Sequence, residues 1–320
     1  APDSPAEYPR VAHRPKNPLI PTRDGVSPSC VAIPFTKPVP WASVLQFLCE
    51  RLPVITPAEW AQRMAHGDVL DDDGRPVLPD AGCTPGARLY YWRQVDDEID
   101  IPFEEHILFQ DEHLLVADKP HFMPVTPGGR TVRHSLMVRL KARTGIDTLN
   151  PIHRIDRETA GLVVFNLRPQ DRNAYHALFR DQAVTKHYEA IAAHQPDVAF
   201  PLTRRSRIEE DVEAFFRMVE VDGEPNSETR IQRIEVSGTW ARYALDPLSG
   251  KRHQLRVHLN ALGAPIAGDR FYPRVRRGPH DVEDFTDPLR LLARAIEFSD
   301  PVTGHRRRFE SRRSLDWPND

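Results

Sequence analysis

Four consecutive apolar residues at 162–165, Leu-Val-Val-Phe, limit the folds open to this chain. An apolar run of this length between polar segments is typical of a strand buried on both faces, whereas a buried helix needs ten residues or more. Residues 186–193 alternate instead, with Tyr188 and Ala190 on one face and His187 on the other. Such alternation is typical of a strand in a sheet with two unlike faces. The sequence therefore predicts a sheet that other elements cover.

Helical patterns and further strands surround these two segments. We expect helices at 135–143, from 169 onward and at 253–262, a strand at 113–117, and a hairpin of 229–236 with 239–246. Apolar residues at helical spacing, such as Leu255 and Leu259, give each helix one face that can cover the sheet. From about 101 to 313 the sequence predicts one α+β domain with a large, mixed, mostly antiparallel sheet flanked by helices.

A smaller α+β module is expected at 41–95. Its pattern predicts a helix at 44–52, a second helix from the capping pair Thr56-Pro57 to Ala65, and short strands at 68–70 and 88–92. Residues 1–40 hold ten prolines and are expected to form an extended arm, because proline cannot continue a helix or a central strand. The acidic stretch at 96–105 is expected to be a linker.

Composition narrows the classes of function. No apolar run approaches the roughly 18–20 residues that cross a bilayer, and the N-terminal residues lack the apolar core of a secretory signal. Three widely spaced cysteines without a CxxC pair predict a cytoplasmic protein without a disulfide framework. Net charge is −3, yet residues 251–313 hold fourteen Lys or Arg against eight Asp or Glu. Charge segregated in this way suits a polyanion on one face, and an ordinary solvated surface is the alternative.

The densest group of chemically capable residues is HRIDRETAGLVVF at 153–165. Asp156 lies in the loop before the apolar strand, flanked by Arg154 and Arg157. A carboxylate beside a core keeps its charge only where a cation or several hydrogen-bond donors stabilise it. Asp156 is therefore a candidate nucleophile, a candidate general base, or a partner in a structural ion pair.

A second group is DPLSGKRHQLRVHLNALGAPIAGDRFY at 246–272. A turn at Gly250 leads into a helix whose first turn holds His253 and Arg256. Arg256 has apolar neighbours and is a candidate for a fixed cation in a cleft. His253 and His258 do not have the spacing of paired zinc ligands, and no HExxH motif occurs, so we expect no metal.

Four segments together resemble the RluA-type pseudouridine synthases. HRIDRETAGLVVF resembles their HRLDxxTSGLLVF signature, KHYEAIA their KxYxA strand, and SGKRHQLRVHLNALGAPIAGDRFY their TGRTHQIRVHLxxLGHPIxGDxxY segment. DEHLLVADKPHFMPVTPGG resembles their opening DxxLLVVDKPxGxxVHPG. The four motifs follow the order of the family over about residues 107–310, roughly two thirds of the chain.

The resemblance implies isomerisation of uridine to pseudouridine in ribosomal or transfer RNA, without a cofactor or metal. Asp156 would attack the sugar, or remove a sugar proton, as the glycosidic bond of a flipped uridine breaks. Tyr188 would stack on the uracil and is a candidate base for the proton on carbon 5, and Arg256 would pair with the aspartate. Arg154 would fill the gap in the RNA stack. The residues expected to contact RNA are Arg154, Arg157, Lys251, Arg252 and His253.

Departures from the family pattern occur at Ala160, Leu292 and Asp300, where the family usually has serine or histidine, and none of them affects the three expected catalytic residues. The substitutions at Leu292 and Asp300 motivate an alternative function, a non-catalytic RNA-binding assembly factor that retains the synthase fold. A third is a hydrolase that uses Asp156 with His153. Residues 41–95 resemble a degenerate copy of a small RNA-binding module first seen in a ribosomal small-subunit protein. We expect a monomer.

Overall fold

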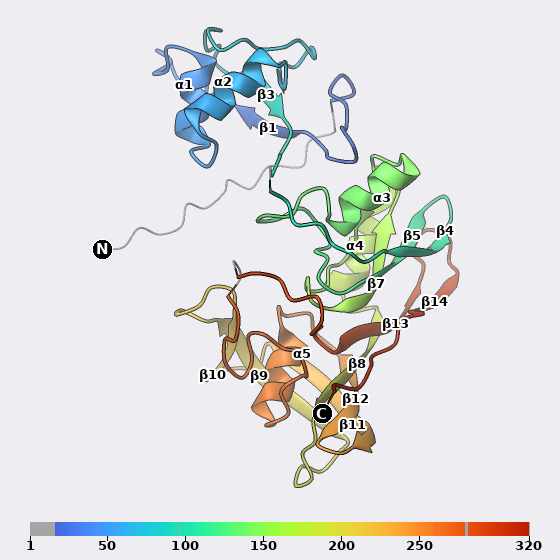
Figure 1. The fold of residues 1–320 in the computed structure, drawn as a ribbon. Helices are drawn as coiled ribbons and strands as arrows, with labels where there is room; N and C mark the ends of the chain where they lie inside the picture. Colours follow the sequence, from blue (N-terminus) through green and yellow to red (C-terminus); the bar gives the residue numbers. More distant parts are fainter. Residues whose placement is uncertain (1–16, 96, 279–280, 320) are drawn as a thin grey trace. The chain divides into compact units, whose positions relative to one another are not determined.

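The structure of the protein is a computed structural model, and it describes residues 17–95, 97–278 and 281–319. The chain divides after Gln94 into two compact units, here called unit 1 and unit 2 (Figure 1).

Unit 1 is a small α+β module, as the sequence predicts. Its elements are β1 (Ser29–Ala32), α1 (Val44–Arg51), α2 (Pro57–Ala65), β2 (Val69–Leu70) and β3 (Arg88–Tyr91), and its antiparallel sheet has the order β1-β3-β2. The two helices bury Phe47 and Trp60 in the core of this unit. Helix α2 begins where expected because the Thr56 hydroxyl accepts from the backbone N–H of Glu59, whose carboxylate accepts from that of Thr56.

An extended arm was expected at residues 1–40, but its described part, residues 17–40, contains a strand of unit 1. Strand β1 pairs with β3, and Ile33 is buried in the core of unit 1. Residues 29–33 contain no proline, and β1 is an edge strand of the sheet, so the prolines on either side interrupt no central strand. Residues 1–16 lie outside the described residues.

Unit 2 is built on one large sheet. Its strands are β4 (His106–Gln110), β5 (Leu114–Lys119), β6 (Asn150–Pro151), β7 (Ala160–Asn166), β8 (Thr185–Ala193), β9 (Leu202–Glu210), β10 (Met218–Val221), β11 (Ser227–Ser237), β12 (Trp240–Pro247), β13 (Leu291–Ser299) and β14 (Arg306–Glu310). The order is β10-β9-β11-β12-β8-β13-β7-β5-β4, with β14 beside β13 and β6 beside β7. Within the described residues only β13 and β7 run parallel, which confirms a mixed, mostly antiparallel sheet.

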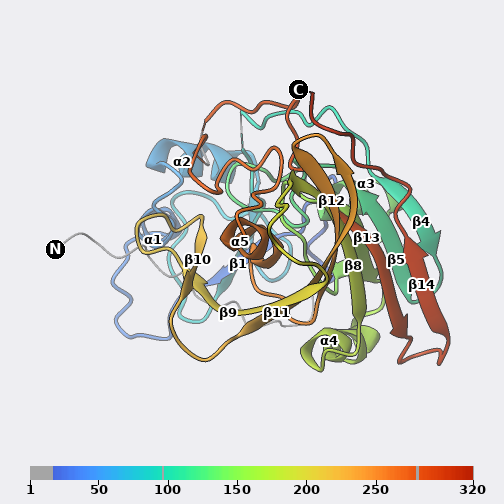
Figure 2. The same ribbon diagram turned by 90° about the horizontal axis from the view of Figure 1, so that it is seen from below.

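Helices cover the sheet of unit 2 on both faces. They are α3 (Leu136–Thr144), α4 (Arg172–Arg180), preceded by a 3₁₀ turn at Pro169–Asp171, and α5 (Gln254–Ala261). Leu136 of α3 packs with Val163, and Tyr175 of α4 packs with Val164, so these two helices lie on opposite faces of β7. The apolar run at 162–165 is buried on both faces, as predicted. Helix α5 lies in the curve formed by β9, β11, β12 and β8 (Figure 2).

The expected linker at 96–105 is packed against unit 2 where the structure describes it. Ile101 is buried in a core cluster of this unit. The Glu105 carboxylate, 6% exposed, lies 2.9 Å from Arg139 Nε and 3.2 Å from Arg143 Nη1. The buried carboxylate of Glu105 therefore ties this stretch to α3 by two ion pairs, which the sequence pattern alone did not indicate. Asp96 lies outside the described residues.

Candidate active site

A cleft of about 970 Å³ opens in unit 2 where three segments meet. These are the loop between β6 and β7, the first half of β8, and the turn that leads into α5. All eight residues expected at the site line this cleft, namely Arg154, Asp156, Arg157, Tyr188, Lys251, Arg252, His253 and Arg256. The fold thus brings together side chains from segments about one hundred residues apart in sequence.

Asp156 lies in the β6–β7 loop with its side chain 23% exposed. Its Oδ2 atom is 3.5 Å from Nη1 of Arg256. The expected ion pair between these two residues is therefore present, and the carboxylate remains accessible from the cleft. A solvent-accessible carboxylate beside a fixed cation can act on a bound molecule.

Arg256 is the most constrained side chain of the site, with a guanidinium that is 0% exposed. Its Nε and Nη2 atoms donate to the two carboxylate oxygens of Asp269 at 2.8 and 2.7 Å. Burial lowers the pKa of Arg256, but the adjacent Asp269 outweighs burial and raises it. Arg256 is thus a permanent cation whose third nitrogen, Nη1, faces Asp156. Asp269 was not predicted as a site residue, although it lies within the third motif as the Asp of GDRFY.

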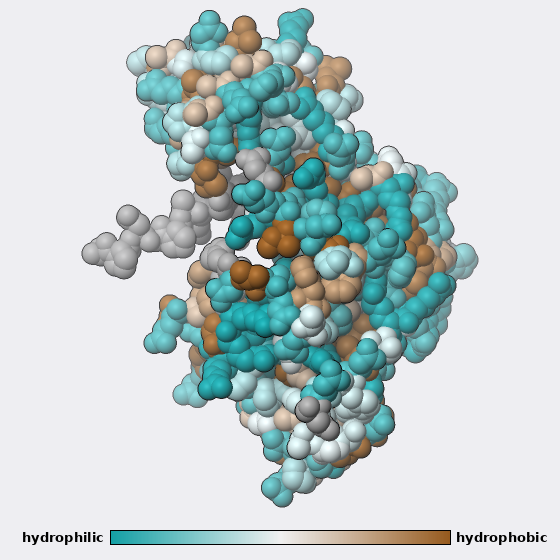
Figure 3. All heavy atoms as spheres, viewed as in Figure 1, coloured by the Kyte–Doolittle hydropathy of each residue, from teal (hydrophilic) through white to brown (hydrophobic). Residues whose placement is uncertain are grey.

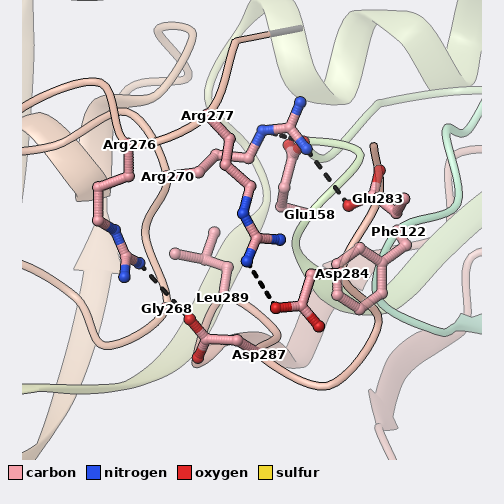
Figure 4. Close-up of a pocket in the computed structure, with 10 residues that line it drawn as sticks. All are labelled: Phe122, Glu158, Gly268, Arg270, Arg276, Arg277, Glu283, Asp284, Asp287 and Leu289. Carbon is pink, nitrogen blue, oxygen red and sulfur yellow. Dashed lines mark hydrogen bonds and ion pairs between the residues drawn. The ribbon is translucent and has the colours of Figure 1, made fainter. Parts of the chain in front are cut away.

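Glu158 is a second buried carboxylate beside Arg256, with Oε2 3.8 Å from Nη1. Burial raises its pKa, but the cations Arg256, Arg157 and Arg270 outweigh this and hold the pKa at about 2. Glu158 is therefore ionised, and it lines a neighbouring cavity of about 270 Å³ (Figure 4). Nη1 of Arg157 lies 3.2 Å from Glu158 Oε1, and its Nη2 pairs with Glu283. Arg157 is committed to this cluster, so its expected role in contacting RNA conflicts with two existing ion pairs.

Tyr188 faces the cleft from β8. Burial and the nearby charge of Asp156 both raise the pKa of its hydroxyl. A hydroxyl that holds its proton this firmly is a poor base at neutral pH. This arrangement suits a stacking surface and disfavours the expected second role of Tyr188 as a base.

His253 is only 8% exposed, which makes it a poor RNA contact. Its Nδ1 atom is 2.9 Å from the Tyr272 hydroxyl, and its ring stacks on Phe271. Burial lowers the pKa of His253 to about 4, so the ring is neutral at physiological pH. The expected RNA contact by His253 stays a prediction that this burial disfavours; the residue immediately precedes α5, at a positive φ of 54°.

The remaining expected RNA contacts are exposed cations on the rim of the cleft. Arg252 donates to the Phe215 carbonyl at 3.1 Å and lies 3.7 Å from the exposed Glu210. Arg154 and Lys251 are exposed and form no ion pair within the described part of the chain. These side chains are available to a polyanion.

The contacts of His153 argue against the third function, a hydrolase that uses Asp156 with His153. Its Nε2 atom accepts the backbone N–H of Val164 at 3.0 Å, and its ring stacks on Phe179. Burial and the neighbouring charge of Lys186 lower its pKa to about 3. The structure therefore assigns His153 to the support of β7.

In the described ranges no three His, Cys, Asp or Glu side chains are grouped as a metal site would require. The expectation that no metal is needed stays a prediction. No helix in the described part of the chain is both long and apolar enough to span a membrane.

Comparison with known proteins identifies the family. A family model described as RNA pseudouridylate synthase matches residues 113–261. The chain is 30% identical over 224 residues to an uncharacterized RNA pseudouridine synthase of Synechocystis sp., covering 67% of this chain and 73% of that protein. It is 32% identical to the dual-specificity RNA pseudouridine synthase RluA of Haemophilus influenzae, covering 67% of this chain and 97% of the relative. A ribosomal large subunit pseudouridine synthase C of Vibrio cholerae is 30% identical, with 62% and 63% covered.

Solved structures agree with this result. Human RNA Pseudouridylate Synthase Domain Containing 4 matches with a TM-score of 0.50 at 26% identity, over 66% of this chain and 88% of that one. Human RNA Pseudouridylate Synthase Domain Containing 1 shares the fold with a TM-score of 0.54 at 22% identity, over 65% and 83%. The chain belongs to the RluA-type RNA pseudouridine synthases, the enzymes that isomerise uridine in RNA.

Proposed function

We propose that this enzyme modifies specific uridines of ribosomal or transfer RNA and that Asp156 is its catalytic group. The observation that carries the proposal is the ion pair of Asp156 with the buried Arg256 in the cleft of unit 2. The pair places a carboxylate beside a fixed cation where an extruded nucleotide can reach it.

The proposed reaction needs no external reactant. A uridine flips out of the RNA stack into the cleft, at a cost of a few kcal/mol that contacts to the RNA must supply. Asp156 either attacks carbon 1′ of the sugar or removes a sugar proton, and the bond from that carbon to N1 of uracil breaks. The uracil turns and carbon 5 bonds to carbon 1′. On the first route the ester bond between Asp156 and carbon 1′ breaks as this bond forms, and on the second Asp156 returns the proton to carbon 2′ of the sugar. The proton then leaves carbon 5 while N1 gains one. Atoms and charge balance, and Asp156 is regenerated.

The neighbouring residues take supporting roles in this proposal. Arg256 stabilises the Asp156 carboxylate anion before the attack, and it stabilises the same anion again when the product has formed. Tyr188 stacks on the uracil. Arg154 is exposed beside the cleft and suits the gap that the flipped base leaves, because guanidinium planes stack on bases. Lys251 and Arg252 supply phosphate contacts on the rim.

Ribosomal and transfer RNA are both proposed as substrates because the names of the relatives refer to both. One is named for the ribosomal large subunit, another for dual specificity, and a yeast mitochondrial relative for transfer RNA. The excess of Lys and Arg at 251–313, fourteen against eight Asp or Glu, supports an RNA partner too. Hydrophilic side chains cover much of the face of unit 2 seen in Figure 3. We further propose that unit 1 is a degenerate RNA-binding module, that the enzyme is monomeric, and that it needs no metal.

Pseudouridine mapping in cellular RNA tests this function. Cells without the gene are compared with cells that carry the wild type or Asp156→Asn. We expect one site or a small set of sites in ribosomal or transfer RNA to regain pseudouridine only with the wild type. If Asp156→Asn restores growth and RNA binding while neither protein changes any site, the chain is the non-catalytic assembly factor instead.

A further inference from the structure

The cleft holds a cation that the function described above leaves without a role. Lys186 lies on β8, partly buried, and its ammonium donates to the backbone carbonyl of Ser249 at 3.1 Å. Among the described residues no carboxylate lies within ion-pair distance of Nζ. An ammonium has three donors, so Lys186 has hydrogen-bonding capacity to spare.

Three other cations that line the cleft have acidic partners, and the two that form no ion pair in the described part of the chain, Arg154 and Lys251, are exposed to solvent. Arg256 pairs with Asp269, Arg157 with Glu283, and Arg252 with Glu210. Lys186 differs from them because it is removed from water without such a partner, and this burial lowers its pKa. A partly desolvated charge without a counterion is costly, and a bound anion would remove that cost.

The position of Lys186 relates it to the uracil site. Lys186 and Tyr188 are two residues apart on one strand, so their side chains leave the same face about 7 Å apart. On the other side Nζ lies over the turn before α5, 3.8 Å from where a β-carbon on Gly250 would be. The neighbouring His153 is neutral, so it neither repels nor satisfies the ammonium.

We propose that the Lys186 ammonium binds the backbone phosphate of the flipped uridine and so holds its sugar against Asp156. This inference rests on the proposed function. In a uridine nucleotide the phosphate is the anion, whereas the uracil is neutral. Lysine binds phosphate as a point charge without a fixed geometry, which suits a group that arrives by rotation out of a stack.

The test separates binding from chemistry in the full-length enzyme. Lys186→Met removes the charge, Lys186→Arg keeps it, and Arg306→Met removes an 84% exposed charge outside the cleft as a control. RNA affinity is measured at several salt concentrations, and tritium release from carbon 5 is followed in single turnover at saturating RNA. We expect Lys186→Met to raise Kd roughly tenfold and to reduce the salt slope by about 0.7–0.9, the value for one phosphate. Its rate at saturation should stay within about threefold of the wild type, because this contact is made before and during the reaction.

Lys186→Arg should restore most of the affinity and the salt slope, and Arg306→Met should change neither. An unchanged Kd and salt slope in Lys186→Met would overturn the proposal. So would a collapse of the saturated rate that arginine does not rescue, since this would indicate proton transfer by Lys186. If Lys186→Met unfolds, Lys186→Gln takes its place, because glutamine keeps a donor for the Ser249 carbonyl. Failure of the proposed function itself is distinguishable, because tritium release would then be absent from the wild type.

Discussion

Asp156 depends on a chain of charges that ends in the protein interior. One nitrogen of Arg256 contacts the Asp156 carboxylate, and its other two nitrogens donate to the Asp269 carboxylate. Asp269 in turn accepts from the backbone N–H groups of Phe271 and Tyr272 at 2.9 and 3.2 Å. Because all four donors converge on one fully buried carboxylate, Asp269 fixes the position of Arg256 and, through it, of the Asp156–Arg256 pair.

Asp269→Asn should therefore destabilise the enzyme by about 3–5 kcal/mol, the usual cost of leaving a buried charge without its partner. Urea denaturation followed by circular dichroism measures the loss. Asp284→Asn is the matched control, because Asp284 pairs with Arg277 on the exposed loop near the smaller cavity (Figure 4). The control should leave the denaturation midpoint unchanged, and equal midpoints for the two variants would refute this account of Asp269.

Residue patterns predicted which residues line the cleft but not the residues that hold them in place. Asp156, Tyr188 and Arg256 were found from the motifs that hold them, and the structure brings them into one cleft. Asp269 and Glu158 went unassigned because a carboxylate in a sequence carries no sign of what will surround it. The burial of His253 could not be predicted for the same reason, because in the sequence a histidine beside Lys251 and Arg252 looks like part of a basic patch.

At the scale of elements, a glycine permits the parallel contact between β7 and β13. Gly161 has a φ of +115° in β7, and a β-carbon there would lie 2.3 Å from the carbonyl oxygen of Ala293 in β13. The two strands pair in parallel at this point, through Gly161 with Ala293. Since Asp156 lies in the loop that leads into β7, this contact also anchors the loop that holds Asp156.

Gly161→Ala should separate β7 from β13 and destabilise the enzyme by more than about 2 kcal/mol, because the added carbon meets backbone and the conformation itself is strained. Gly145→Ala is the control at the end of α3, where φ is +71° but no atom lies within 4 Å of the added carbon. It should cost only about 1 kcal/mol from the backbone conformation. Thermal unfolding of both variants checks this, and similar losses would contradict the role of the close approach.

Helices were predicted better than strands because their ends carry local signals. Thr56-Pro57 begins α2 and Gly145 ends α3 at a left-handed φ. Strands β9 and β10 were not predicted, because β9 carries five charged residues in nine and only Ile208 of it is fully buried. The order of the strands, and with it the cleft, depends on contacts between distant segments that no local pattern records.

At the scale of the whole molecule, buried histidines link stability to pH. Burial lowers the pKa of His121, His253 and His258 to about 4 and that of His153 to about 3. An unfolded histidine takes up a proton near pH 6.5, whereas these folded ones stay neutral until pH falls to about 4. The stability that they contribute is thus complete above pH 6.5 and declines as pH falls through this window.

The unfolding free energy should accordingly fall between pH 7 and pH 5, by up to about 1.4 kcal/mol per pH unit for each such histidine. His258→Gln should flatten this slope, because the ring that hydrogen-bonds Ser206, Ser227 and Thr229 is removed. His66→Gln, at an exposed position in unit 1, should leave the slope as it is. Urea titrations at several pH values measure all three, and a pH-independent wild type would contradict the burial argument.

The central claim is that a single carboxylate, Asp156, breaks the glycosidic bond of a uridine held in the cleft. Release of tritium from carbon 5 of uracil in a bound RNA substrate tests it most directly. The account predicts release by the wild type and none by Asp156→Asn, with the variant binding the same RNA at a similar Kd. Undiminished release by Asp156→Asn would show that another group carries the reaction.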